Sequence, residues 1–283
     1  MEFVKMARAL DVHVAGWPLR VLFDADVSLE EGPAERAERL WRGERSTLRW
    51  LQLEPRGHAA LRIGVVASSR IADYALLTFD SEGPCPPDAM DALCAAAALT
   101  ECGRRTNEDG IAFDTAAGTI GVGAADGEGR RNVAFRHASR EFAEHAVLAS
   151  AAGLSLDPGN APGLEAYLRG LGEQGQRTVL MEERDDGRRV LAVAGRHGRL
   201  LRAPRAAAVG AALAALGAEP GLSYRFFGLA GGVVEGLTSA ATGPNEEAAA
   251  DLDWELRARA RLVASCEFVL DPGDALGEGF LLR

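Results

Sequence analysis

Apolar and polar positions alternate in several short stretches of the chain and recur with helical spacing in others. Alternation over residues 8–24, broken at Gly16 and Pro18, predicts a strand, a turn and a second strand. Residues 32–41 carry apolar positions on one helical face, and Pro33 suits a first turn, so a short amphipathic helix is predicted there. Further strands are predicted at residues 48–53, 60–67 and 72–79.

Two alanine-rich stretches have the start and stop signals of helices. Residues 87–102 and residues 204–216 each begin at a proline and end just before a glycine. Strands are predicted ahead of the second stretch, at residues 178–182 and 190–195. The repeated order predicts an α+β protein of two similar lobes, each with an antiparallel sheet around one apolar helix, because that arrangement buries both helices.

The rest of the chain is predicted to form shorter elements. They are a hairpin over 110–135 with its turn at 124–129, a loop over 150–163, a helix over 164–171, an exposed connection over 238–253 with a helical turn at 244–247, and a closing strand pair over 254–270. Gly231 and Gly232 lie in a segment that lacks the spacing of a phosphate-binding loop.

Composition narrows the functional classes. The chain has 283 residues and a formal net charge of −10, which disfavours nucleic acid as a partner because that affinity comes largely from basic side chains. Four scattered cysteines predict neither a disulfide framework nor a metal site. We expect a cytoplasmic protein without a membrane span, since no apolar run has the length of a span or a signal peptide. The expected state is a monomer or a homodimer.

Three segments resemble motifs of the proline racemase and hydroxyproline epimerase family. Residues 11–21 read Asp-Val-His-Val-Ala-Gly-Trp-Pro-Leu-Arg-Val, similar to the family's opening Asp-x-His-Thr-Gly-Gly-Glu-Pro-x-Arg-Val. Residues 53–58 match the family's Leu-Glu-Pro-Arg-Gly-His in full. Residues 267–272 with 279–280 resemble its closing strand and tail. The combination makes chance agreement remote.

The resemblance implies a diaminopimelate epimerase-like fold, with two pseudo-symmetric lobes that each wrap a barrel-like antiparallel sheet around a central helix. The N-terminal lobe is predicted to comprise residues 1–124 plus 264–283, and the C-terminal lobe residues 125–263. In the family the two helix N-termini face one cleft that holds a small carboxylate substrate. Two cysteines there exchange protons with the substrate, without any cofactor.

Both catalytic cysteines of the family are absent from this chain. Alignment with the family motifs puts Asp88 at the first cysteine and Met90 at its neighbouring histidine. It puts Arg205 at the second cysteine and Leu201 at the aspartate of that motif. The family's glycine-rich strand also has no counterpart around residues 150–162, so the second lobe is abridged. Two-thiol racemisation is therefore not expected.

The candidate catalytic residues each have two interpretations. Asp88 could be a general base, or it could cap the helix, for which aspartate is among the best residues. Arg205 could bind a substrate carboxylate or stabilise a dienolate, or it could pair with Asp88 and close the site. Cys85 and Cys94 lie near the first site, but either would need a register shift to replace the lost cysteine.

Other motif residues are candidates for the substrate pocket. His13, Glu54 and His58 lie in segments that match the family, and with Met90 and Leu201 they complete the predicted pocket. A structural role is the more common one for such histidines, and Glu54 could instead pair with Arg56 or orient the lobe interface. No set of residues predicts a metal site.

The sequence supports three functional hypotheses. The first is a cofactor-independent isomerase that shifts a proton and a double bond on an unsaturated cyclic amino acid related to proline, as in alkylproline precursor pathways of secondary metabolism. The second is a catalytically silent relative that binds a proline-like ligand or a protein. The third, a hydroxyproline dehydratase, is weaker because such enzymes are expected to keep the nucleophile at the first site.

Overall fold

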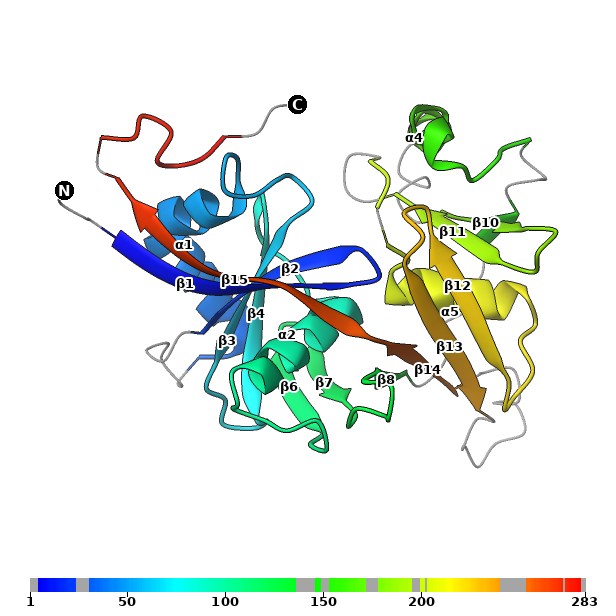
Figure 1. Cartoon of the computed structure of the whole chain (residues 1–283), viewed down its shortest axis with the longest axis horizontal. Coiled ribbons are helices and arrows are strands. Elements are labelled where there is room, and N and C mark those ends of the chain that lie inside the picture. The colour runs from blue at the N-terminus through cyan, green and yellow to red at the C-terminus, as the bar shows by residue number, and fades with distance from the viewer. Residues whose placement is uncertain are drawn as a thin grey trace. The chain divides into compact units, whose positions relative to one another are not determined.

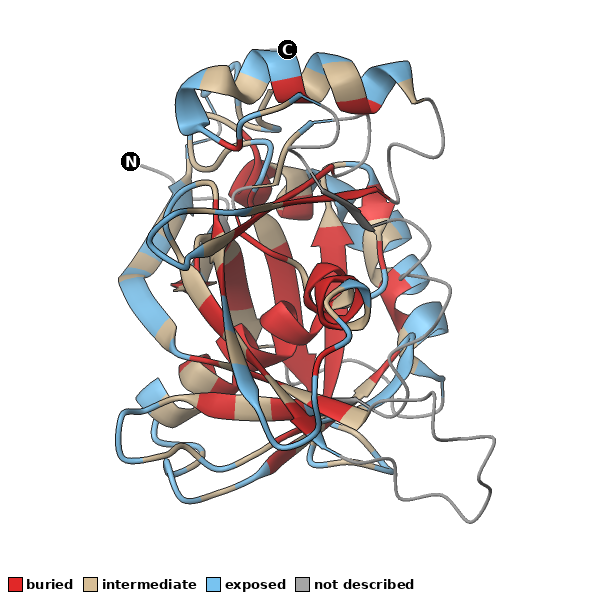
Figure 2. Ribbon diagram, turned by 90° about the vertical axis from the view of Figure 1, so that its right-hand side faces the viewer, coloured by how far each residue is buried: buried red, intermediate tan, exposed pale blue. Residues whose placement is uncertain are grey.

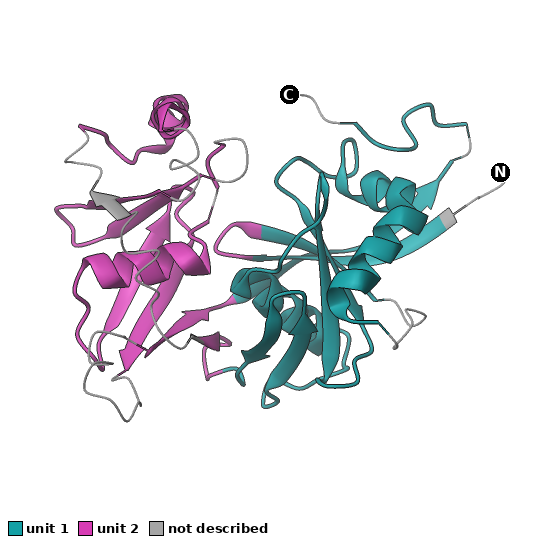
Figure 3. Ribbon diagram, turned by 180° about the vertical axis from the view of Figure 1, so that it is seen from behind, with its two compact units in different colours: residues 1–13, 18–125, 260–283 teal, residues 14–17, 126–259 magenta. Residues whose placement is uncertain are grey.

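The chain divides into two compact units. The computed structural model describes residues 5–23, 31–135, 146–148, 153–171, 178–194, 199–201, 203–239, 253–271 and 273–280. Unit 1 comprises residues 1–13, 18–125 and 260–283, and unit 2 comprises residues 14–17 and 126–259 (Figure 3). The tip of the first hairpin, residues 14–17, thus groups with unit 2, whereas the lobe boundaries predicted from the sequence put it in the first lobe.

Unit 1 is built on a mixed sheet with the strand order β15-β1-β2-β3-β4-β6-β7 (Figure 1). Its strands are β1 (Lys5–Val14), β2 (Trp17–Phe23), β3 (Arg62–Ala67), β4 (Tyr74–Asp80), β5 (Gly83–Pro84), β6 (Ile111–Thr115), β7 (Gly118–Val122) and β15 (Ala260–Leu270). The pairs β2–β3 and β4–β6 are parallel, and β5 pairs antiparallel with β4. The prediction of purely antiparallel pairing is therefore corrected to a mixed sheet.

Two helices of unit 1 pack against strands β3 and β4. Helix α1 (Pro33–Gln52) buries Leu48 and Leu51 in one core cluster with Ile63 and Val65 of β3. Successive strand residues point to opposite faces, so Arg62 lies on the other face of β3, where α2 (Ala89–Glu101) packs. Helix α2 also contacts β7 and β15. Its residues are buried nearly all the way round, as expected for a central helix.

The strands of unit 2 follow the order β8-β14-β13-β12-β11-β10-β9. Its strands are β8 (Arg131–Phe135), β9 (Ala146–Leu148), β10 (Val179–Glu183), β11 (Arg189–Val193), β12 (Ser223–Gly228), β13 (Val233–Ser239) and β14 (Asp253–Ala258). The helices are η2 (Pro158–Asn160), α4 (Ala161–Gly170) and α5 (Ala206–Ala215). Helix α4 buries residues on one side only, whereas α5 is buried over most of its surface (Figure 2).

Helix α5 is the central helix of unit 2. It packs against β9, β10, β13 and β14. Two glycines allow this close packing. A Cβ on Gly210 would lie 2.9 Å from the Trp254 ring, and a Cβ on Gly236 would lie 2.9 Å from a Leu213 methyl. Each unit therefore contains one alanine-rich, buried helix against a sheet, which confirms the predicted α+β class with two central helices.

The predicted elements agree with the structure over most of the described chain. The first hairpin, the strands predicted within 60–79 and 178–195, and both alanine-rich helices are confirmed within a few residues. The short helix begins at Ala161 instead of residue 164. The predicted helical turn at 244–247 lies outside the described residues. None of the described helices is long and apolar enough to cross a membrane.

The local structure differs from the predictions in four places. Residues 48–53 form the end of α1 and not a strand, because a short apolar run fits either element. The 110–135 segment has a tight turn at residues 116–117, which joins β6 to β7, in addition to the predicted turn, where the Gly129 amide donates to the Asp126 carbonyl. Strands β12 and β13 were missed around the Gly231 turn. The last two strands do not pair with each other: β14 joins the sheet of unit 2 and β15 that of unit 1.

Candidate functional site

Asp88 caps the N-terminus of α2. Its Oδ1 accepts a hydrogen bond from the Met90 amide at 3.1 Å, and its own amide donates to Oδ2 of Asp91 at 2.8 Å. This reciprocal arrangement is a capping box with aspartate in the third helical position. Asp88 retains 7% of its accessible surface. The cap interpretation of Asp88 thus has direct geometric support.

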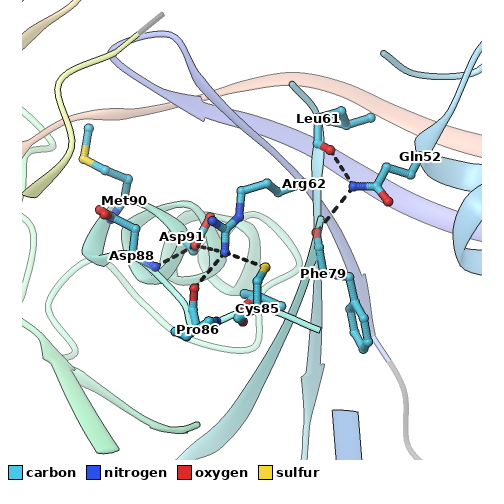
Figure 4. Close-up of polar contacts among 10 residues, drawn as sticks. Gln52, Leu61, Arg62, Phe79, Cys85, Pro86, Asp88, Met90 and Asp91 are labelled. Carbon is cyan, nitrogen blue, oxygen red and sulfur yellow. Dashed lines mark hydrogen bonds and ion pairs between the residues drawn. The ribbon is translucent and has the colours of Figure 1, made fainter. Parts of the chain in front are cut away.

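A buried ion pair lies directly beneath this cap (Figure 4). Asp91 is fully buried, and Nη2 of Arg62 lies 3.0 Å from its Oδ2. The same nitrogen donates to the sulfur of Cys85 at 3.1 Å and to the carbonyl of Pro86 at 3.0 Å. A buried carboxylate needs such a partner, since removing one member of a buried pair is strongly destabilising.

The cysteine nearest the cap is held as a thiol. Residue 85 follows the short strand β5, and its backbone exchanges hydrogen bonds with Thr78 of β4. Burial raises the pKa of the Cys85 thiol to about 11, although the neighbouring Arg62 guanidinium opposes the increase. A thiol with this pKa is protonated near neutral pH and is a poor nucleophile. Burial and protonation therefore make Cys85 a poor substitute for the family's first cysteine.

Alkylation tests this assignment of thiol states. In the folded protein at about pH 8, iodoacetamide is expected to modify exposed Cys102 and half-buried Cys266 and to spare Cys85 and Cys94, since both are buried. Peptide mass spectrometry measures the modified fraction at each position. All four should react in urea, which serves as the control. Rapid labelling of Cys85 in the folded protein would contradict its assignment as an inert thiol.

Arg205 precedes the central helix of unit 2. It occupies the cap position of α5 but makes no side-chain capping hydrogen bond. Its guanidinium carbon lies 6.0 Å from the centre of the Trp17 ring, at the limit of a cation–π contact. Trp17 stands where the resembling motif has glutamate, and Arg205 where the second motif has cysteine. Two departures from the family pattern are thus neighbours in unit 2.

The hairpin tip beside Arg205 is tightly packed within unit 2. A Cβ on Gly232 would lie 2.1 Å from the carbonyl oxygen of Ala15, so only glycine fits at that point of the β12–β13 turn. Ala15 itself has a φ of 52°, a conformation that favours glycine. Trp17 is buried to 6% exposure. The tip therefore provides a fixed surface on which the Arg205 side chain lies.

The family-like opening motif supports the fold of unit 1. Arg20 makes a two-pronged ion pair with Asp11, with both N–O distances 2.7 Å. Its Nη1 also donates to the carbonyls of Leu51 and Arg56. The guanidinium carbon lies 4.3 Å from the centre of the Phe268 ring on β15. Arg20 is only 4% exposed, so one buried cation joins three segments that are distant in sequence.

The second motif, residues 53–58, binds the C-terminal tail. Glu54 and Phe280 exchange two backbone hydrogen bonds of 3.0 Å. Arg56 donates to the carbonyls of Trp50 and Leu276, both at 2.9 Å. A Cβ on Gly57 would lie 2.0 Å from the Gln52 carbonyl oxygen, which only glycine avoids. Asp11 and Arg20 of the first motif, residues 53–58 and the C-terminal segment thus meet in unit 1 as structural elements, whereas residues 14–17 of the first motif belong to unit 2.

The other predicted pocket residues are placed as follows. His13 lies on β1 and is half-buried. His58 accepts a hydrogen bond from the Ala60 amide at its Nδ1, 3.2 Å away, which fixes a turn. Met90 is fully buried beside Asp88. Leu201, in unit 2, donates its amide to the Val193 carbonyl. Of these residues, Met90 is joined to Asp88 through the cap hydrogen bond, and the pocket itself stays a prediction.

Sequence reasoning missed Arg62, Asp91 and Trp17. The sequence did contain a signal for Arg62 and Asp91. Asp91 follows Asp88 by the three-residue spacing of a capping box, and Arg62 opens an otherwise apolar strand, where a charge requires a partner. Among the described residues, no group of three or more His, Cys, Asp or Glu side chains is placed to hold a metal ion.

Comparison with solved structures identifies the fold of the chain. No protein-family model and no curated protein matches the sequence. A hydroxyproline epimerase from Agrobacterium vitis, solved with bound trans-4-hydroxy-L-proline, superposes with a TM-score of 0.72 at 21% identity over 100% of this chain and 96% of that one. A probable proline racemase from Agrobacterium radiobacter, with bound carbonate, gives 0.73 at 22% identity over 98% and 96%.

The chain has the fold of the proline racemases. A Bacillus anthracis phenazine biosynthesis protein of the PhzF family also matches, with a TM-score of 0.63 at 14% identity over 94% of this chain and 99% of that one. At these identities the comparisons establish the fold, and the predicted diaminopimelate epimerase-like class is confirmed. A shared fold does not determine what this chain does.

Proposed function

We propose that the protein is a cofactor-independent isomerase that moves a proton, and with it a double bond, on a small unsaturated cyclic amino acid related to proline. The supporting observation is the carboxylate of Asp88 at the N-terminus of a buried central helix, at the position of the first cysteine in the motif that the sequence resembles. A positioned carboxylate can act as a general base. The helix N-terminus also favours negative charge nearby.

One carboxylate is sufficient for a proton shift of this kind. Oδ1 of Asp88 accepts a hydrogen bond from the Met90 amide, so proton transfer is assigned to Oδ2. The carboxylate takes a proton from one substrate carbon, and the C–H electron pair enters a delocalised dienolate. The same oxygen then returns the proton to a second carbon on the same face. The double bond moves, Asp88 regains its starting charge, and no oxidant or reductant is consumed.

Arg205 is proposed to bind the substrate carboxylate. Its guanidinium stays protonated, so it cannot act as a base, but its planar donors match a carboxylate. The contact with Trp17 restricts the side chain before a ligand binds. The assignment of Asp88 and Arg205 to a single substrate site stays a prediction.

A catalytically silent binding protein is the second candidate. The observation that favours it is the capping box, because Oδ1 of Asp88 is already engaged by the helix. Such a protein would bind a proline-like acid without turning it over. Binding measured by calorimetry, together with proton and double-bond positions measured by NMR, separates the two candidates.

No racemisation of proline or hydroxyproline is expected. Two-base racemisation needs an acid and a base on opposite faces of the substrate, and an arginine cannot alternate between those states. Each amino acid is incubated with the protein in deuterated water, followed by NMR and chiral chromatography. Exchange at the α-carbon together with formation of D-proline would contradict the proposal. Unsaturated proline-like acids, followed by the same NMR experiment, provide the positive test.

Arg205→Ala is expected to lower kcat/KM by about ten- to a hundredfold and to raise KM. A charged two-pronged contact is made in the ground state as well as in the transition state, which accounts for the rise in KM. Steady-state kinetics on an accepted substrate measures both constants. Arg188→Ala is the matched control, since that side chain is half-exposed in unit 2 and pairs with Asp186. Equal effects of the two substitutions would mean that Arg205 does not bind the substrate.

A further inference from the structure

Strand β15 forms an open edge of the sheet in unit 1. It ends the strand order beside β1, and among the described strands none pairs along its outer side. The backbone donors and acceptors on that side can therefore pair with another chain. Proteins usually prevent such pairing by keeping edge strands short or by placing proline or lysine in them, but β15 has 11 residues and contains neither.

Apolar side chains are exposed along this strand. Leu262, Val263 and Val269 retain 44%, 64% and 41% of their accessible surface, and Met6 on the neighbouring β1 retains 56%. Single exposed apolar residues are common on protein surfaces, but a group of them on one long edge strand is typical of a surface that another chain covers.

The two charges of β15 are placed symmetrically about its middle. Arg261 and Glu267 are the only charged residues of the strand, and Ala264 lies midway between them. Both charged side chains are exposed, and their even spacing puts them on the same face. In an antiparallel pair of two β15 strands centred on Ala264, Arg261 of each copy lies directly opposite Glu267 of the other. Two opposite-charge pairs, related by a twofold axis, favour this pairing.

Other registers lack this match. A centre one residue further along the strand puts both charges opposite valines. A centre one residue earlier would pair Glu267 with Arg259, which lies outside β15. Pairing centred on Ala264 uses residues 260–268, so nearly the whole strand takes part. The charge pattern therefore favours one register and one partner, a second copy of the same chain.

We propose that β15 pairs with β15 of a second copy in an antiparallel ladder with its twofold axis at Ala264. Leu262 then lies opposite Cys266 of the other copy, and Val263 opposite Ser265, so exposed apolar surface is removed from water. The contact uses the same strand in both copies and closes at two, which leaves no open β15 edge for further growth. None of these residues has a part in the proposed isomerase reaction, so the dimer is tested independently of turnover.

Sedimentation velocity over loading concentrations of about 1 to 100 μM tests the dimer, since a contact of one strand is small and its Kd should fall near this range. Arg261→Glu puts like charges opposite each other at both ends of the ladder and should raise the Kd about ten- to a hundredfold. Glu267→Arg should do the same, although it also removes the 2.8 Å pair with Arg8 of its own copy. Arg70→Glu, an equal charge change at an exposed position between β3 and β4, is the matched control.

Mixing the two β15 variants tests the antiparallel arrangement. Chains with Arg261→Glu and chains with Glu267→Arg should each be largely monomeric alone. Together they should form a mixed dimer, because opposite charges again face each other at both ends of the ladder. A mixture that stays monomeric would contradict the arrangement.

Disulfide cross-linking tests the register. In a background with Cys102→Ser and Cys266→Ser, Ala264→Cys should form an intermolecular disulfide on mild oxidation, because opposite residues of an antiparallel pair lie about 4.5 to 5.5 Å apart. Val263→Cys should cross-link poorly, since its two copies are diagonal neighbours about 7 to 8 Å apart. Better cross-linking by Val263→Cys would overturn the register.

Cys266 provides a measurement on the unmodified chain. Its alkylation should slow as the protein concentration rises through the Kd of the dimer, because Leu262 of the other copy then lies opposite it. Exposed Cys102 should react at the same rate throughout and is the internal control. A chain that stays monomeric at every concentration, or a dimer that neither Arg261→Glu nor Glu267→Arg weakens, would overturn the proposal.

Discussion

Asp88→Asn is expected to abolish turnover while leaving the free energy of unfolding within about 1 kcal/mol of the wild-type value. Asparagine caps helices about as well as aspartate, and its oxygen can accept the Met90 amide that Oδ1 accepts in the wild type. The asparagine side chain cannot take a proton from a substrate carbon. Loss of a general base lowers the rate by about 10² to 10⁴, which for a slow isomerase is loss of measurable activity.

The measurements are turnover on unsaturated proline-like acids and urea unfolding followed by circular dichroism. Asp88→Ala is the companion variant, because it removes both the base and the cap and should also destabilise the protein by about 1 kcal/mol. Full activity of Asp88→Asn would transfer the role of base to Glu54, His13 or His58. Wild-type protein that binds these acids but turns over none of them would establish the silent relative instead.

The fold could be predicted from sequence because its signals are local or depend on whole motifs. The proline starts and glycine stops of the alanine-rich segments predicted α2 and α5, whose apolar surfaces then required enclosure by sheets. The end of α1 was mistaken for a strand because Leu48, Trp50, Leu51 and Leu53 are dense enough to fit either period. Parallel pairings such as β2–β3 were missed because they join segments some 40 residues apart, with no turn to indicate them.

The candidate site was predicted only in part. Asp88 was identified by its position in a motif, and the capping alternative was stated with it. Arg62 comes from a strand 26 residues earlier in the chain, and its contact with Asp91 depends on how β3 packs against α2. Alternation within a strand assigns Arg62 to a face but does not identify which helix covers that face. The same holds for Trp17 and Arg205, which are joined only by the fold of unit 2.

The charged residues of the family-like motifs illustrate a second limit of sequence reasoning. Glu54, Arg56 and Arg20 all match family positions, and Glu54 was predicted to line the substrate pocket. In the structure Arg20 donates both to Asp11 and to the carbonyls of Leu51 and Arg56, Arg56 donates mainly to backbone carbonyls, and the backbone of Glu54 holds the tail. Such contacts are invisible in the sequence, because carbonyl acceptors are present at every residue and only packing selects among them.

Arg20→Ala is expected to have the largest effect on stability, with a loss of about 3 to 5 kcal/mol in the free energy of unfolding. The substitution would leave the Asp11 carboxylate without its two-pronged partner and the carbonyls of Leu51 and Arg56 without their donor. It would also remove the cation beside Phe268. Urea unfolding followed by the fluorescence of Trp50, which lies in the same core region, measures the loss.

Arg8→Ala is the matched control for Arg20→Ala. Arg8 lies on β1 and also pairs with an acidic residue, Glu267 of β15, at 2.8 Å, but its side chain is 87% exposed. Water and salt screen such a pair, so its removal should change the free energy of unfolding by less than about 1 kcal/mol. The loss of unfolding free energy in Arg20→Lys should fall between those of the two alanine variants, because lysine keeps the positive charge but cannot make the two-pronged contact with Asp11. A loss below about 1 kcal/mol for Arg20→Ala would mean that the motifs meet without depending on this cation, and the structural role assigned to them here would have to be given up.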